Sequence, residues 1–171
     1  MKISTNAIGI KLFSNNGFRL VRNLCRLITD GKALSNLSPA ENILSESEKQ
    51  MILAILTNVT AEGVECCNAV IASRNFVEYC FNSLSASINA TKISAAQLLS
   101  NLSLFSPEKL HSTLSKDSDG DDYLKMIIGK DFEFYNPDFG WYFLIICVQI
   151  FKVAKNQKGD PWKSKFFVEG G

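Results

Sequence analysis

The chain has 171 residues, which is enough for one medium-sized domain or for a short array of helical repeats. Hydrophobic residues make up 46% of it and charged residues 20%, so a large share of the chain is expected to be buried. The formal net charge is +1 and the basic residues are scattered, which argues against a nucleic-acid-binding protein, because phosphate binding requires clustered lysine and arginine.

The N-terminal part of the chain predicts two helices joined by a loop. Within 18–28, apolar residues recur at i, i+4, i+7 and i+8, the spacing of an amphipathic helix. Serine, asparagine and proline are frequent in 32–42, which is typical of a loop. Ser45 and Glu48 form a capping-box pattern, so a second helix is expected to start there and to end near Gly63.

Shorter helices are expected in the middle of the chain. A serine followed by a proline, Ser106-Pro107, ends one helix and caps the next, because proline is favoured in the first helical turn. The segments predicted to be helical are 64–72, 76–86, 94–103 and 107–115, with a loop at 87–92. No hairpin signal occurs, so the predicted fold class is all-α.

The C-terminal part holds the longest apolar run of the sequence. A short helix is expected at 123–129, between a charged loop at 116–122 and an aromatic loop at 130–140. The run itself predicts a helix over 141–155 that is apolar on every side and therefore fully buried. A membrane span requires about 20 apolar residues, and this run is shorter and contains Gln149, so no membrane segment is expected.

A six-residue pattern occurs twice, as ILTNVT at 55–60 and LLSNLS at 98–103. The two copies lie 43 residues apart, within the 40–47 residues of an armadillo or HEAT unit, and the long helix 141–155 follows as a degenerate third copy. The predicted fold is an armadillo/HEAT-like right-handed α-solenoid of about two and a half repeats. It forms a single domain over 1–171, divided into a partial repeat 18–63, repeats 64–106 and 107–158, and a tail or further element 159–171.

Stacked repeats bury the same positions in each copy, which explains the paired leucines Leu56 and Leu99. The asparagines of the motif have two explanations. Their amides bond the loop or carbonyl groups of their own repeat, or they line a concave groove and bond the backbone of a partner. On the second explanation the candidate protein-binding residues are Asn58, Gln97, Asn101 and Gln149.

The segments ILAILTNVTAEG and ISAAQLLSNLS resemble the third helix of an armadillo repeat. Armadillo proteins that carry nuclear cargo have a tryptophan four residues before the asparagine, where this chain has Ala54, Gln97 and Ile145, so an importin-type function is not expected. The succession ILTNVT, LLSNLS and WYFLIICVQIFKVAKNQKG, with the terminal KFFVE, more closely resembles the armadillo chaperone family that assists folding of eukaryotic translation elongation factor two.

This resemblance implies a non-enzymatic interaction scaffold that acts as a cytosolic co-chaperone. The implied partners are a protein client, translation elongation factor two, and a cytosolic chaperonin. A structural or regulatory armadillo module within a larger protein complex is the alternative. No apolar signal-peptide core follows Met1, which fits a cytoplasmic protein.

No catalytic, cofactor or metal site is expected. The five cysteines include no CxxC pair and are interpreted as reduced and buried. The acidic DSDGDD at 117–122 lacks the glycine and the glutamate that an EF-hand loop requires, since Asp122 and Ile128 occupy those positions. The single histidine, His111, has no evident catalytic partner and is assigned a surface or packing role.

Overall fold

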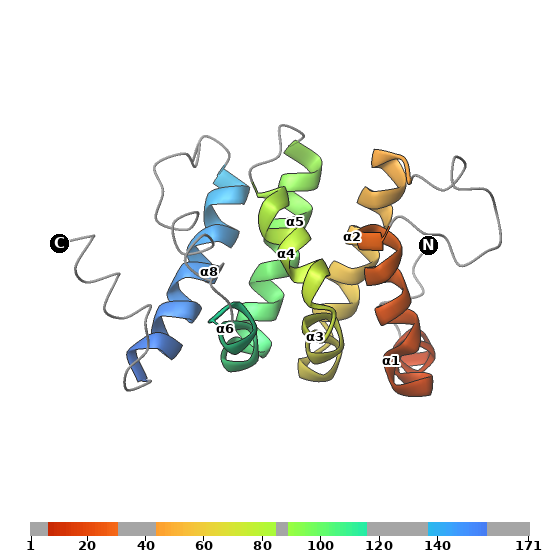
Figure 1. Cartoon of the computed structure of the whole chain (residues 1–171), viewed down its shortest axis with the longest axis horizontal. Coiled ribbons are helices and arrows are strands. Elements are labelled where there is room, and N and C mark those ends of the chain that lie inside the picture. Colours follow the sequence, from red (N-terminus) through yellow and green to blue (C-terminus); the bar gives the residue numbers. More distant parts are fainter. Residues whose placement is uncertain (1–6, 31–43, 85–88, 116–136, 157–171) are drawn as a thin grey trace.

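The computed structural model describes residues 7–30, 44–84, 89–115 and 137–156 (Figure 1). Within these ranges every element of secondary structure is an α-helix, which confirms the all-α prediction. The helices are α1 (Ala7–Asp30), α2 (Glu46–Thr60), α3 (Val64–Ile71), α4 (Arg74–Ser83), α5 (Asn89–Phe105), α6 (Pro107–Ser115) and α8 (Pro137–Asn156). The loop expected at 32–42, the segments 116–122 and 123–129, and the tail 159–171 lie outside the described residues.

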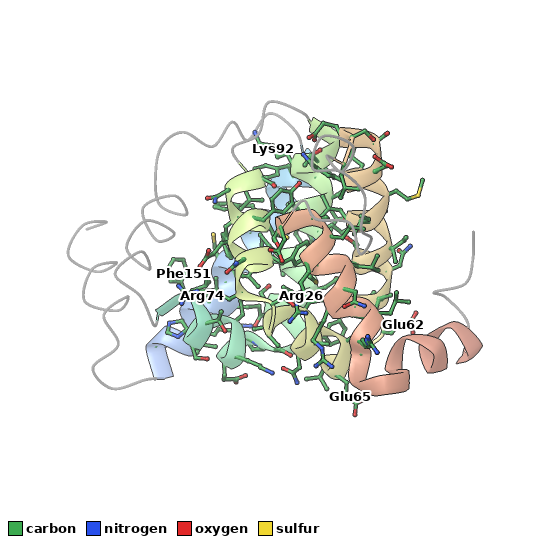
Figure 2. All side chains as sticks on the ribbon, turned by 45° about the vertical axis from the view of Figure 1, so that its right-hand side comes forward. Arg26, Glu62, Glu65, Arg74, Lys92 and Phe151 are labelled. Carbon is green, nitrogen blue, oxygen red and sulfur yellow. The ribbon has the colours of Figure 1, made fainter. Side chains whose placement is uncertain are left out.

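The helices form two layers. In Figure 1, α1, α3, α4 and α6 lie in front, and α2, α5 and α8 form a row behind them. Figure 2, seen from another side, shows the same separation, with α1 in front and α2 at the right. Within the row, α2 packs against α5 and α5 packs against α8, so the three helices expected to carry the motif are adjacent and follow chain order.

Local signals in the sequence account for several helix ends. The capping box of α2 is present: the Ser45 hydroxyl accepts from the Glu48 N–H at 3.3 Å, and the Ser45 N–H donates to Glu48 Oε2 at 2.8 Å. Gly63 precedes α3 with φ +142° and ψ −176°, a conformation that only glycine adopts readily. The hydroxyl of Ser106, before α6, has no hydrogen bond within the described part of the chain, so its expected side-chain cap is not formed.

Four helices start earlier than predicted, and one of them is α4, which begins at Arg74 and not at residue 76. α1 begins at Ala7 and changes direction along its length (Figure 2). Phe18, where the helix was expected to start, has a left-handed φ of 61°. α5 begins at Asn89, so the loop expected at 87–92 is helical from that residue on. α8 begins at Pro137 within the expected aromatic loop, because proline is well tolerated in a first helical turn.

The core lies between the layers and along the row. The paired positions of the motif are buried in both copies, since Leu56, Leu99 and Leu102 are fully buried and Val59 nearly so. The small hydroxyl residues of the motif, Thr57, Thr60, Ser100 and Ser103, are buried as well and allow the helices to approach closely. The largest fully buried side chains are Phe76, Phe81, Phe139, Leu53, Leu56, Ile71, Leu84, Leu98, Leu99, Leu102, Leu110 and Ile146.

The expectation that the last helix is buried on every side is wrong. Three large apolar side chains of α8 are exposed: Trp141 by 64%, Leu144 by 53% and Val148 by 41%. The physical reason is its position at the end of the row, where only one side of α8 has a described neighbour within the row. None of the helices in the described ranges combines the length and the apolar content that crossing a bilayer requires.

Candidate functional site

The side of the α2–α5–α8 row that points away from the front layer is the candidate site, and we call it the outer face. Its residues recur at the same motif positions and are not buried: Ala54 and Asn58 of α2, Gln97 and Asn101 of α5, and Ile145 and Gln149 of α8. Residues three and four positions apart share one side of a helix, so each pair lies along the same stripe. All four predicted protein-binding residues are therefore on this face.

Asn101 is held by the neighbouring helix. Its Nδ2 donates to the main-chain oxygen of Thr57 at 3.0 Å and to the hydroxyl of Thr60 at 3.2 Å, both at the end of α2. This is neither a bond within its own repeat nor a contact with a partner protein. The amide nitrogen ties two successive helices of the row together, while Asn101 Oδ1 has no hydrogen bond within the described ranges.

A thiol from the front layer completes this junction. Cys67 of α3 donates to the main-chain oxygen of Thr60 at 3.3 Å and lies 3.8 Å from the main-chain oxygen of Asn101. The Thr60 hydroxyl also bonds Leu56 O within α2, at 2.9 Å. The polar groups where α2, α3 and α5 meet are thus hydrogen-bonded to one another within an otherwise apolar core.

Asn58 occupies the equivalent position on α2 but is exposed and has no hydrogen bond among the described residues. Because α2 is the first helix of the row, no described helix lies beside Asn58 in the way that α2 lies beside Asn101. The same residue type in the same motif position is therefore structural in one copy and open to solvent in the other.

Gln97 and Gln149 are both partly buried on the outer face. Neither side chain makes a hydrogen bond within the part of the chain that the structure describes. Exposed apolar groups follow the same helical spacing on this face: Met51 of α2 is three positions from Ala54, Leu104 of α5 is three positions from Asn101, and the two are exposed by 65% and 46%. The outer face thus combines amides with exposed aliphatic groups, which suits a peptide or protein surface.

The described ranges give little support for a metal site or for a catalytic role of His111. No group of three or more histidine, cysteine, aspartate or glutamate side chains there is arranged to hold a metal ion. His111 is buried, which agrees with a packing role. The acidic segment 117–122 lies outside the described residues.

The five cysteines are free thiols, and four are buried. Burial raises the pKa of Cys25, Cys67 and Cys147 to about 12 each, and it raises the pKa of Cys80 well above its ordinary value. These thiols therefore remain protonated at neutral pH and are poor nucleophiles.

An open pocket of about 550 Å³ lies between the first turns of α2 and α5 and the helices α1 and α4. No motif in the sequence marks it, since it is assembled from single polar residues of four helices. Burial raises the pKa of the Tyr79 hydroxyl in its wall. The lining residues are Thr29, Glu46, Lys49, Asn75, Glu78, Tyr79, Asn82, Ser83 and Thr91.

Comparison with known proteins gives no assignment: no family model matches the chain, and neither a curated protein nor a solved structure matches it.

Proposed function

We propose that the chain is a non-enzymatic protein-interaction scaffold whose client lies along the outer face. One observation carries the proposal. The outer face of the α2–α5–α8 row is left uncovered by the front layer, and it presents amides and aliphatic groups at positions that recur from helix to helix. An uncovered surface of this composition is typical of a protein-binding site.

The proposed architecture is the armadillo/HEAT-like right-handed α-solenoid, with α2, α5 and α8 as the third helices of successive repeats. Its support is the chain-order stacking of these helices and the bond from Asn101 to Thr57, which joins two copies of the motif. The proposed role is that of a cytosolic co-chaperone assisting the folding of a translation elongation factor. That client is supported by the resemblance of the motifs to the chaperone family.

The test is a binding assay between the purified chain and translation elongation factor two, with and without cytosolic chaperonin. Ala54→Arg places a long charged side chain on the α2 part of the outer face without touching the core, because Ala54 is exposed. We expect it to weaken client binding at least tenfold, or by about 1.4 kcal/mol, with an unchanged melting temperature.

The matched control is Ala72→Arg, the same exchange at an exposed position after α3 in the front layer. It should leave client binding unchanged. Equal binding by both variants would show that the client does not use the outer face. A stable complex of fixed stoichiometry with proteins other than a folding client would favour a structural module of a larger complex.

A further inference from the structure

The middle of each helix in the α2–α5–α8 row carries no charge. The sequence has no aspartate, glutamate, lysine or arginine in 50–60 of α2, in 93–105 of α5 or in 139–151 of α8. Each of these ranges covers about three helical turns and includes the motif position of its helix. The part of the outer face that these three ranges form is called the neutral band below.

Burial does not account for this absence of charge. Met51, Ala54 and Asn58 of the neutral band are exposed on α2. Leu104 of the band is exposed on α5. The side of a surface helix that faces water usually carries charged residues. The band therefore lacks charge even at positions that are open to water.

The front layer shows the usual pattern. Each of its helices has charged residues at its surface: Arg19, Arg22 and Arg26 of α1, Glu65 of α3, Arg74 and Glu78 of α4, and Glu108 and Lys109 of α6. The row itself carries charge at helix ends, since Glu48 lies in the first turn of α2 and Lys152 near the end of α8. The absence of charge is thus a property of the neutral band and not of the surface helices in general.

We propose that the neutral band binds a client segment that has no charged side chains, and that it excludes acidic and basic segments alike. Depletion of charged residues distinguishes the centre of a protein interface from the rest of a surface. A charged client side chain over the band would lose water without gaining a counter-charge. The proposal rests on the proposed function, because it takes the outer face as the binding surface.

The polar groups of the neutral band favour the same class of segment. The side chains of Asn58, Gln97 and Gln149 make no hydrogen bond within the described part of the chain. Each of these neutral amides offers both donors and an acceptor, which match uncharged polar groups. Met51 and Leu104 add exposed apolar surface beside them. The client segment is therefore expected to combine aliphatic residues with serine, threonine, asparagine or glutamine.

A library of random peptides tests this preference without assuming a client. Packed helices lie about 8–10 Å apart and an extended chain rises about 3.3 Å per residue, so peptides of about ten residues are long enough to cross the row. Phage-displayed peptides are selected on the immobilised full chain and sequenced. Charged residues should be depleted in the selected pool. A pool with the charge content of the input, a pool enriched in either sign, or no selected peptide would overturn the proposal.

A single exchange in a selected peptide measures the size of the effect. Replacing a central uncharged residue of the peptide by lysine or by glutamate should weaken binding about tenfold or more in both cases, because the band supplies no counter-charge. Fluorescence anisotropy of the labelled peptides gives the two dissociation constants. Weakening by only one of the two signs would show that the bound peptide meets a charged surface, and would overturn the proposal.

Charge introduced into the neutral band should change the selected pool. Ala54 is exposed, so Ala54→Glu and Ala54→Arg add a charge without disturbing the core. The Ala54→Glu chain should select peptides enriched in lysine and arginine, and the Ala54→Arg chain peptides enriched in aspartate and glutamate. The matched control, Ala72→Glu, adds a charge at an exposed position in the front layer and should select the original neutral pool. Unchanged pools with both Ala54 variants, or a changed pool with Ala72→Glu, would contradict binding at the band.

These outcomes are independent of the elongation factor. If translation elongation factor two fails to bind while the selected peptides are neutral and respond to the Ala54 variants, only the assignment of the client is wrong. If the factor binds the outer face and the selected peptides are not depleted in charge, the client assignment stands and the preference for a neutral segment is refuted.

Discussion

Asn101 on α5 donates its side-chain amide to the main-chain oxygen of Thr57 on α2, 44 residues earlier in the chain. The contact joins two copies of the same sequence motif, and the Thr60 hydroxyl accepts a second bond from the same nitrogen. Repetition of the motif is therefore explained in part by a bond from one copy to the next. The asparagine supplies the donor and the preceding copy supplies the acceptors.

Removing this donor should destabilise the fold. Asn101→Ala eliminates two hydrogen bonds at a partly buried site, each worth roughly 0.5–1.5 kcal/mol, so a loss of about 1–2 kcal/mol in the free energy of unfolding is expected. Urea denaturation followed by circular dichroism measures it. Asn58→Ala is the matched control and should change stability by less than about 0.5 kcal/mol, because Asn58 is exposed. Equal effects of the two substitutions would refute the structural distinction between the asparagines.

The capping box of α2 gives a second prediction. Ser45→Ala removes the hydroxyl that accepts from the Glu48 N–H, and a loss of about 1 kcal/mol is expected. Thermal melting at pH 7 measures the change. Ser47→Ala removes the contact between the Ser47 and Ser45 hydroxyls, which are 3.1 Å apart, but keeps both bonds of the box, so a smaller loss is expected. A Ser45→Ala protein as stable as the original would mean that α2 is held by packing alone.

Gly63 provides a third prediction, because its φ of +142° with ψ −176° is a region populated almost solely by glycine. Gly63→Ala should cost about 1–3 kcal/mol through backbone strain. No atom lies within 4 Å of the added carbon, so steric contact does not contribute. The reverse exchange at a helical position, Ala61→Gly, should cost no more than about 1 kcal/mol. Chemical denaturation of both variants decides whether the strain is present.

The buried thiols predict sensitivity to alkali. Burial raises the pKa of Cys25, Cys67 and Cys147 from an ordinary 9.0 to about 12. Between these values the folded chain retains protons that the unfolded chain has lost. The corresponding stability is therefore complete below the ordinary pKa and decreases as the pH rises toward the raised pKa.

The melting temperature should accordingly fall steeply above a pH of about 9, the ordinary pKa of a thiol. Cys147→Ala removes one of these thiols at a partly buried position and should make the decline shallower. A variant whose melting temperature follows the same curve as the original would show that this thiol does not contribute.

Some of the fold follows from the sequence because its causes are local. Helical spacing around Leu56 and Leu99 predicted that both would be buried, and the pairing of Ser45 with Glu48 predicted the start of α2. The early starts of α1 and α5 were missed, since 7–17 contains two glycines and two asparagines and 89–92 lacks apolar periodicity. Such residues weaken a helix prediction, although packing against other helices can override it.

The candidate site was only partly predictable for a geometric reason. Helical periodicity places Gln97 and Asn101 on one side of α5, but it contains no information about what lies beside that side. The acceptor for the Asn101 amide is a main-chain oxygen of α2, so it depends on how α2 and α5 pack together in three dimensions. For the same reason the apolar content of 141–155 suggested complete burial, whereas exposure depends on which helices surround α8.

The central position of α5 has a consequence for local unfolding. α5 packs against α2, α3, α4, α6 and α8, so its backbone opens only when contacts with both layers are lost. Helix α8, which stands at one end of the row, can separate from it while the rest stays intact. In deuterium exchange, the amide protons of α8 should therefore be replaced early and those of α5 last, so that the chain opens from its edge toward its centre.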